Sequence, residues 1–221
     1  MKKLILLFAV LFSVNSVFAQ AFKPVKLDSL VTISMPAVYS EKDTLGQHIY
    51  TVNSDLGYMV TIRQPNAKGN EPLKKEKDLN SVLKKYISGI QKQSGNGSAQ
   101  FVRDTTIGNL KAKAFTLITD DGIGNISNRD FVLLYTQEAT YTFEFGFADS
   151  RKELVKDERK AYFSSIKLSP QLQRDDQYTD TRAAASRVNT GLIIEIAAGA
   201  LVVFALGWLI FFRKKNRVSI E

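Results

Sequence analysis

The stretch ATYTFEFGFADSRKELV, residues 139–155, has the period of a β-strand and then changes to polar turn residues. Tyr141, Phe143, Phe145 and Phe147 alternate with small or polar residues, so they share one face of the strand. Such an aromatic row is typical of a sheet face that other elements cover. We therefore expect this row in the core, and a ligand groove lined by the same row is the alternative.

Further strands are expected on both sides of this one. Alternating hydrophobic residues predict three strands early in the chain, around 31–35, 48–52 and 58–62. Gly108-Asn109 and Gln137-Glu138 each separate two β-rich runs, which predicts two hairpins. The arms of these hairpins are expected at residues 101–107, 110–119, 130–136 and 140–147, with a loop at 120–128.

Two helices complete the expected order. Residues 78–93 carry apolar side chains at helical spacing, and Ser94 to Ser98 (SGNGS) ends the pattern. Ser150 and Glu153 match a capping box, which predicts a second helix from that point. Its expected sheet-facing side chains are Leu154, Ala161, Tyr162, Ser165 and Ile166.

The resulting order is β-β-β-α-β-β-β-β-α, with neighbouring strands joined by short turns. Short connections favour antiparallel pairing, since parallel strands need long crossovers. The sequence therefore predicts an α+β fold in which an antiparallel sheet and packed helices form a sandwich.

This order, the segment ATYTFEFGFADSRKELV and the closing FSSIKLSP of residues 163–170 resemble the PsbP-like fold family. The family includes an extrinsic subunit of photosystem II, a Ran-binding nuclear import factor and exported bacterial proteins. The resemblance covers Phe22 to Pro170. It implies a compact binding or accessory module, often tied to a membrane assembly, without shared catalytic residues, and it transfers no individual site residue.

Both ends of the chain carry hydrophobic segments. Residues 1–19 combine Lys2 and Lys3 with a short apolar run and small residues before Gln20, which predicts a signal peptide. Residues 191–212 span roughly 33 Å as a helix, enough for a hydrocarbon core of about 30 Å, which predicts a single transmembrane helix. An uncleaved first membrane helix is the alternative for residues 1–19.

These segments predict the domain organisation and the location. We expect the folded domain at 20–170, a polar juxtamembrane stalk at 171–190 and a basic cytoplasmic tail at 213–221. Within the stalk, an outward extension of the membrane helix over 180–188 is the alternative. This is a single-pass type I topology in a bacterial inner membrane, with the domain in the periplasm or outside the cell. Glu195 lies near the outer end of the helix; it is expected to reach the headgroups, and a functional intramembrane acid is the alternative.

Composition excludes several functions. The chain has a net charge of +8, but basic residues exceed acidic ones by only four between Gln20 and Pro170, so no nucleic-acid partner is expected. It has no cysteine, which excludes thiol catalysis, cysteine-ligated zinc and lipid attachment at an N-terminal cysteine.

A few residues of the sequence could take part in catalysis, metal binding or lipid binding. His48, the only histidine, lies in a strand pattern without a nucleophile motif, so a structural or surface role is expected. Asp120, Asp121 and Asn125 stand among glycines, where a tight turn is expected and a calcium loop is the alternative. The lysines of the first helix are expected to be a solvated face, with contact to anionic lipid as the alternative: Lys74, Lys75, Lys77, Lys84 and Lys85.

The sequence thus identifies no catalytic, cofactor-binding or metal-binding residue. The function it favours is a non-enzymatic, membrane-anchored extracytoplasmic binding or accessory module for a protein partner or membrane complex. One alternative is a hydrolase that uses the carboxylates of Asp120 and Asp121. Another is a carrier of a lipid or small ligand with a cavity behind Phe143 and Phe145.

Overall fold

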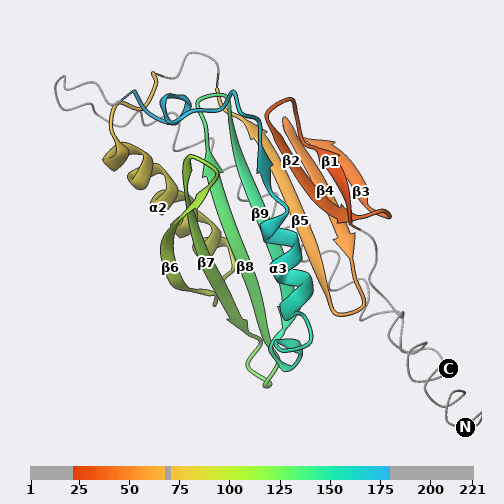
Figure 1. Ribbon diagram of the computed structural model, residues 1–221. Coiled ribbons are helices and arrows are strands. Elements are labelled where there is room, and N and C mark those ends of the chain that lie inside the picture. Colours follow the sequence, from red (N-terminus) through yellow and green to blue (C-terminus); the bar gives the residue numbers. More distant parts are fainter. Residues whose placement is uncertain (1–21, 68–70, 180–221) are drawn as a thin grey trace, which may run out of the picture.

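The computed structural model describes residues 22–67 and 71–179, which form a layered α+β structure with two antiparallel sheets (Figure 1). The larger sheet has seven strands in the order β3-β4-β5-β9-β8-β7-β6. Its strands are β3 (Ser40–Thr44), β4 (Gln47–Asn53), β5 (Gly57–Pro65), β6 (Ser98–Ile107), β7 (Leu110–Asp120), β8 (Ile126–Tyr135) and β9 (Ala139–Ala148).

A second, three-stranded sheet covers part of one face of the larger sheet. It contains β1 (Phe22–Lys26), β2 (Val31–Pro36) and β10 (Lys167–Leu168), with β2 in the middle. The sequence predicted β2 but placed it in the same sheet as the other strands. It is separate because β2 pairs with β1 and with β10, a segment far away in the chain.

The two helices lie on opposite faces of the seven-stranded sheet. Helix α2 (Glu76–Gln93) packs on Phe115 and Phe131 in one cluster, whereas α3 (Lys156–Ser164) packs with the three-stranded sheet on the other face. The order of layers is therefore α2, the large sheet, and then α3 beside the small sheet. Helix α2 confirms the helix predicted from the apolar spacing of residues 78–93.

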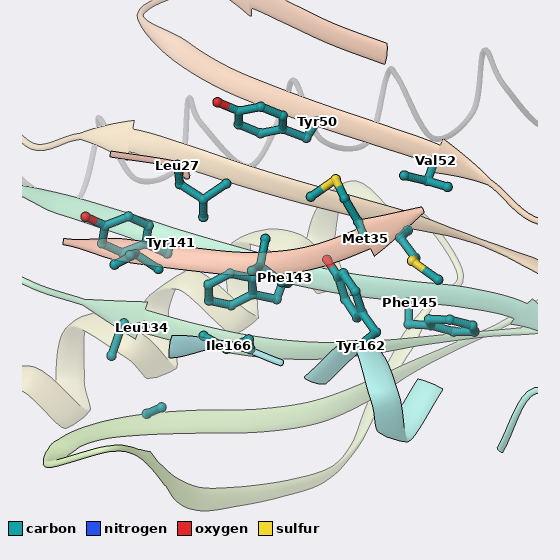
Figure 2. Packing of buried hydrophobic residues seen from close by; sticks show 14 of the residues in the cluster. Leu27, Met35, Tyr50, Val52, Leu134, Tyr141, Phe143, Phe145, Tyr162 and Ile166 are labelled. Atoms are coloured by element: carbon teal, nitrogen blue, oxygen red, sulfur yellow. The ribbon is translucent and has the colours of Figure 1, made fainter. Parts of the chain in front are cut away.

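The aromatic row of β9 forms the centre of the core on the α3 side (Figure 2). Tyr141, Phe143 and Phe145 are fully buried, and Phe147 is nearly so. Figure 2 shows Tyr162 of α3 close to Phe145, and their ring centroids lie 6.1 Å apart. Burial of each phenylalanine contributes roughly 1.5–3 kcal/mol. The expected core role is confirmed.

The opposite side of β9 buries an ion pair. Arg129 donates from Nε to Oε1 of Glu144 at 2.7 Å and from Nη2 to Oε2 at 3.0 Å, and both side chains are almost completely buried. Burial raises the pKa of the neighbouring Tyr58, and the charge of Glu144 raises it further. Next to this group stands Gly146, where an added Cβ would lie 2.2 Å from the Tyr58 ring. Only glycine fits there.

Helix α3 begins later than the capping box predicted. Ser150 lies in a 3₁₀ helix, Asp149–Arg151, and the α-helix starts at Lys156 after Val155, without a side-chain cap. Long-range hydrogen bonds fix the preceding segment, because Asn128 donates to Asp149 and Arg151 donates to the carbonyl oxygens of Asp55 and Leu56.

This later start changes which side chains the helix buries. Leu154 and Ala161 are exposed, contrary to expectation, whereas Tyr162 and Ile166 are buried as predicted. The half-buried Ser165 contacts the small sheet: its hydroxyl accepts a hydrogen bond from the backbone N–H of Ser34.

Two expected boundaries also change. Strand β8 begins at Ile126, so the loop predicted over 120–128 is confined to residues 121–125. Beyond Pro170 the chain stays on the domain, because Leu172, Gln177 and Tyr178 are buried. Gln177 bonds to both backbone groups of Lys111 and to the carbonyl of Tyr135. Residues 171–178 therefore belong to the fold and not to a flexible stalk.

Neither helix in the described ranges is long and apolar enough to cross a bilayer. The predicted signal peptide, transmembrane helix, Glu195 and basic tail lie outside the described residues.

Candidate functional site

A groove of about 580 Å³ runs between α3 and the strands β6, β7 and β8. Its lining residues lie on the α3 side of the large sheet, beside the edge strand β6. Figure 1 shows β6 at one edge of this sheet and the small sheet towards the other. Its volume is in the range of pockets that hold small ligands. One wall is α3 with the turn before it, and the other is the edge strand β6.

The floor of the groove has an apolar part beside a polar part that contains Thr116 and Asp130. In the apolar part, Ile107, Val132 and Ile166 belong to or pack against the main core cluster, as does Phe163 of α3, and the buried Ala114 lies beside them on β7. The Phe163 ring meets the buried Tyr162 ring edge-on at 5.1 Å, so the half-buried Phe163 side chain has a fixed support. A ligand that reaches this floor removes apolar surface from water, which favours binding.

The rim is strongly basic. Five cationic side chains and a single carboxylate line the groove. The cationic residues are Arg103, Lys152, Lys156, Arg159 and Lys160. Lys156 and Lys160 are one helical turn apart, so they project from the same side of α3. On another side of the helix, Glu158 accepts a hydrogen bond from Ser54, and burial raises the pKa of this glutamate.

The single carboxylate, Asp130, is already neutralised. Nη1 of Arg159 donates to Oδ2 of Asp130 at 2.9 Å, and the Thr116 hydroxyl donates to Oδ1 at 2.5 Å. The Arg159 guanidinium also lies 5.6 Å above the centre of the Phe147 ring, which holds it in place. Arg159 and Asp130 therefore form a fixed pair at the base of the groove.

The remaining four cations carry unneutralised charge. Among the described residues, no ion pair engages Arg103, Lys152, Lys156 or Lys160. All four are exposed. Their mutual repulsion is relieved when an anion binds between them, so the groove is suited to a negatively charged group.

Phe101 gives the β6 wall an exposed aromatic ring. It lies in a bulge where the pairing of β6 with β7 shifts between Gln100 and Arg103. Its φ angle is +53°, which is unusual for a residue with a bulky side chain, and its exposed fraction is 69%. Backbone strain of this kind gathers at binding sites, where it costs about 1–3 kcal/mol.

The acidic loop has the turn role that its sequence predicted. Oδ1 of Asp120 accepts the N–H of Gly122, and Oδ1 of Asp121 accepts the N–H groups of Ile123 and Asn125. Oδ2 of Asp121 accepts a hydrogen bond from the side-chain amide of Asn125. Both carboxylates thus serve the loop itself. No cluster of three or more metal-ligating side chains occurs within residues 22–67 and 71–179.

His48 has the surface position that its strand pattern predicted. Its side chain is 42% exposed on β4, and its Nδ1 lies 2.8 Å from Oδ1 of Asp43 on the edge strand β3. The groove lies at the other edge of the sheet, beside β6. The structure therefore does not bring the histidine to the candidate site.

The other sequence candidates also lie away from the groove wall. The lysines of α2 are on the opposite face of the sheet from α3, and Phe143 and Phe145 are core residues. The sequence contains one signal for the groove, the four-residue spacing of Lys152, Lys156 and Lys160. Nothing local in the sequence links these lysines to Arg103, because β6 and α3 meet only in the folded chain.

Comparison with known proteins finds likeness at the level of structure only. No protein-family model matches the sequence. No curated protein matches it either. Solved structures that are similar include cyanobacterial PsbP from Synechocystis sp. PCC 6803, at 13% identity and a TM-score of 0.49, over 70% of this chain and 96% of that one. The PsbP-like resemblance noted from the sequence thus recurs among these structures.

Two further structures are similar over shorter or looser alignments. LpqN of Mycobacterium tuberculosis, described as involved in cell envelope biogenesis, has 12% identity and a TM-score of 0.43, over 68% of this chain and 91% of that one. A protein from Bacteroides thetaiotaomicron has 13% identity and a TM-score of 0.36, over 64% of this chain and 46% of that one. Similarity at this level gives no information about ligand or activity.

Proposed function

We propose that the chain is a non-enzymatic binding module of the bacterial cell envelope and that the groove between α3 and β6 is its ligand site. A single helix at residues 191–212 tethers the domain to the inner membrane. The domain faces the periplasm or the outside of the cell, and it serves as an accessory to a membrane-associated partner.

The observation that carries this proposal is the lining of the groove. Four cations that form no ion pair with the described residues stand above a partly apolar floor, in a hollow large enough for a small ligand. Such a surface binds an anionic, partly apolar group without chemical change. The proposed cellular location rests on the two terminal hydrophobic segments, which have the lengths and flanking charges of a signal peptide and a membrane anchor.

Photocrosslinking in living cells tests the site. The full-length chain is expressed with benzoylphenylalanine in place of Lys156, which lines the groove, or in place of Lys85, an exposed lysine on α2. We expect a discrete adduct after illumination of the Lys156 variant and none from the Lys85 variant. Equal labelling of both variants, or no adduct from either, contradicts a binding site in the groove.

The same cells can be used to test the proposed location and membrane topology. Fractionation is expected to place the full-length chain in the inner membrane, with the domain open to a protease added from the periplasmic side. A stop codon after Thr179 is expected to release the domain from the membrane. A domain that resists the external protease in intact spheroplasts would refute the proposed topology.

A further inference from the structure

We infer that the ligand of the groove is an anionic phospholipid of the membrane to which the module is tethered. This inference rests on the proposed function and specifies its ligand. The phosphate is held by Lys152, Lys156, Lys160 and Arg103, and the beginning of an acyl chain lies on Phe163 and Ile166.

Charge complementarity supports this ligand. A phosphodiester presents a compact negative charge to several donors at once, and lysine is a common point-charge binder of phosphate. The rim offers three lysines and one arginine from two sides of the groove, while the only carboxylate is already paired with Arg159. An anion that enters therefore meets no unpaired carboxylate among the lining residues.

The apolar part of the floor, at Phe163 and Ile166, distinguishes a lipid from a free phosphate. Inorganic phosphate or a sugar phosphate uses the rim alone and leaves the floor in water. An amphiphile uses both parts, and each buried methylene group adds a favourable contribution. The exposed ring of Phe101, held at the β6 wall by a bulge, extends the apolar surface towards solvent.

The length of chain between the domain and the predicted membrane helix limits the distance between the groove and the membrane. Gln177 is fixed to Lys111 at the β6–β7 hairpin, and Thr106 of this hairpin lines both the groove and a smaller hollow that contains Arg174. The described chain thus passes one end of the groove and then ends at Thr179, whose N–H donates to the carbonyl oxygen of Leu73 on the α2 side of the sheet. Residues 180–190 span at most about 40 Å when extended, so the groove stays within reach of the headgroups beside the predicted membrane helix.

The edge of the sheet argues against an acidic peptide as the occupant. A peptide would bind this site most simply by adding a strand to β6, which is the edge strand next to the groove. The bulge between Gln100 and Arg103 interrupts the regular pairing of that strand. Bulges of this kind protect edges against added strands. A lipid needs no backbone pairing.

Hydrogen exchange of the reconstituted protein tests the inference. The full-length chain is placed in nanodiscs of phosphatidylcholine alone or with phosphatidylglycerol, and exchange is followed by mass spectrometry. We expect phosphatidylglycerol to slow the exchange of peptides from residues 152–163 and to leave those from residues 77–92 unchanged. Glycerol 3-phosphate and an octaglutamate peptide, each added to the phosphatidylcholine discs, represent a free phosphate and an acidic peptide.

Matched triple variants show whether the groove is responsible. Replacing Lys152, Lys156 and Lys160 by Gln is expected to weaken lipid binding about a hundredfold, from about fivefold per lysine, and to abolish the protection. The control variant replaces Lys77, Lys85 and Lys92 by Gln, which removes the same charge from exposed positions of α2. It is expected to keep the protection.

The outcomes separate this inference from the proposed function. If only octaglutamate slows the exchange of residues 152–163, the lipid inference is overturned but a binding groove remains. The same holds if glycerol 3-phosphate slows this exchange as much as phosphatidylglycerol does. Loss of lipid protection in both triple variants shows general charge attraction and overturns the groove as the lipid site. If the reconstituted chain responds to none of the three probes, both the inference and the proposed ligand site are refuted.

Discussion

Replacement of Asp28 by Asn removes a charge that joins the two sheets. Asp28 lies in the turn between β1 and β2, and its Oδ1 accepts the N–H groups of Leu30 and Val31 at 2.8 and 2.9 Å. Its Oδ2 accepts Nε of Arg63 at 2.6 Å and the hydroxyl of Tyr141 at 2.5 Å. Both of these donors belong to the seven-stranded sheet.

The expected loss of stability follows from which hydrogen bonds of Asp28 the Asn variant keeps. An asparagine retains the Oδ1 contacts but turns an amide group towards two donors, so two hydrogen bonds to a charged acceptor are lost. Each contributes about 1.5–3 kcal/mol when intact, and part is recovered by rearrangement. Only 21% of the Arg63 side chain is exposed, so its charge is left without full hydration. We expect a loss of about 3 kcal/mol in the free energy of unfolding.

The pH dependence gives a second, independent test. Burial alone would raise the pKa of Asp28, but the hydrogen bonds from Tyr141 and Arg63 and from two backbone amides outweigh it and lower the pKa. A lowered pKa in the folded state means that the charge stabilises the fold above the unfolded value of about 3.9. The difference between the wild-type chain and the Asn variant should therefore be constant near pH 7 and shrink as the pH falls below about 4.

Urea unfolding of the full-length chain in a neutral detergent measures these quantities, with near-ultraviolet circular dichroism of the buried tyrosines as the signal. Asp43→Asn is the control, because Asp43 is exposed and pairs only at the surface with His48. It is expected to change the unfolding free energy by less than about 0.5 kcal/mol. A loss below about 1 kcal/mol for Asp28→Asn at pH 7 would refute the reasoning, as would a difference that does not shrink in acid.

Three further substitutions test local features by the same unfolding measurement. Gly146→Ala should lower the free energy of unfolding by about 3 kcal/mol, because the added Cβ meets the Tyr58 ring. The additional substitution Tyr58→Ala should recover part of this loss. An unchanged free energy of unfolding in Gly146→Ala contradicts the close approach of the two residues. Leu45→Asn should raise the free energy of unfolding by about 1 kcal/mol, because Leu45 has a strained φ of +49° beside Gly46 in the β3–β4 turn and asparagine tolerates this angle better. A lower free energy of unfolding would contradict backbone strain at Leu45. Phe101→Asn should also stabilise, by roughly 0.5–1 kcal/mol, while it weakens phosphatidylglycerol-dependent protection of α3; unchanged protection would remove Phe101 from the ligand site.

The order of secondary structure elements was largely predictable because each depends on local spacing. The apolar residues of α2 recur every three or four positions, and those of β9 every second position, so each pattern is visible within a short stretch of sequence. The Gly108-Asn109 turn is similarly local: Gly108 has φ +53° between β6 and β7. The turn role of Asp121 followed for the same reason.

The start of α3 shows where local reasoning failed. Ser150 and Glu153 have the spacing of a capping box, yet long-range contacts of Asp149 and Arg151 decide the backbone there. A cap of this kind stabilises a helix end by about 1 kcal/mol. Several tertiary hydrogen bonds and the burial of Val155 outweigh it.

By itself, the sequence determined the class of the fold, the identity of the core strand and the absence of cysteine chemistry. These depend on residue type and on short-range periodicity. Only the tertiary structure decided that β2 and β10 form a second sheet, that residues 171–178 belong to the domain, and that Arg103 faces Lys156 and Lys160 across a groove. Each of these joins segments that are far apart in the chain. Such a pairing depends on the packing of the whole core, which no local pattern records.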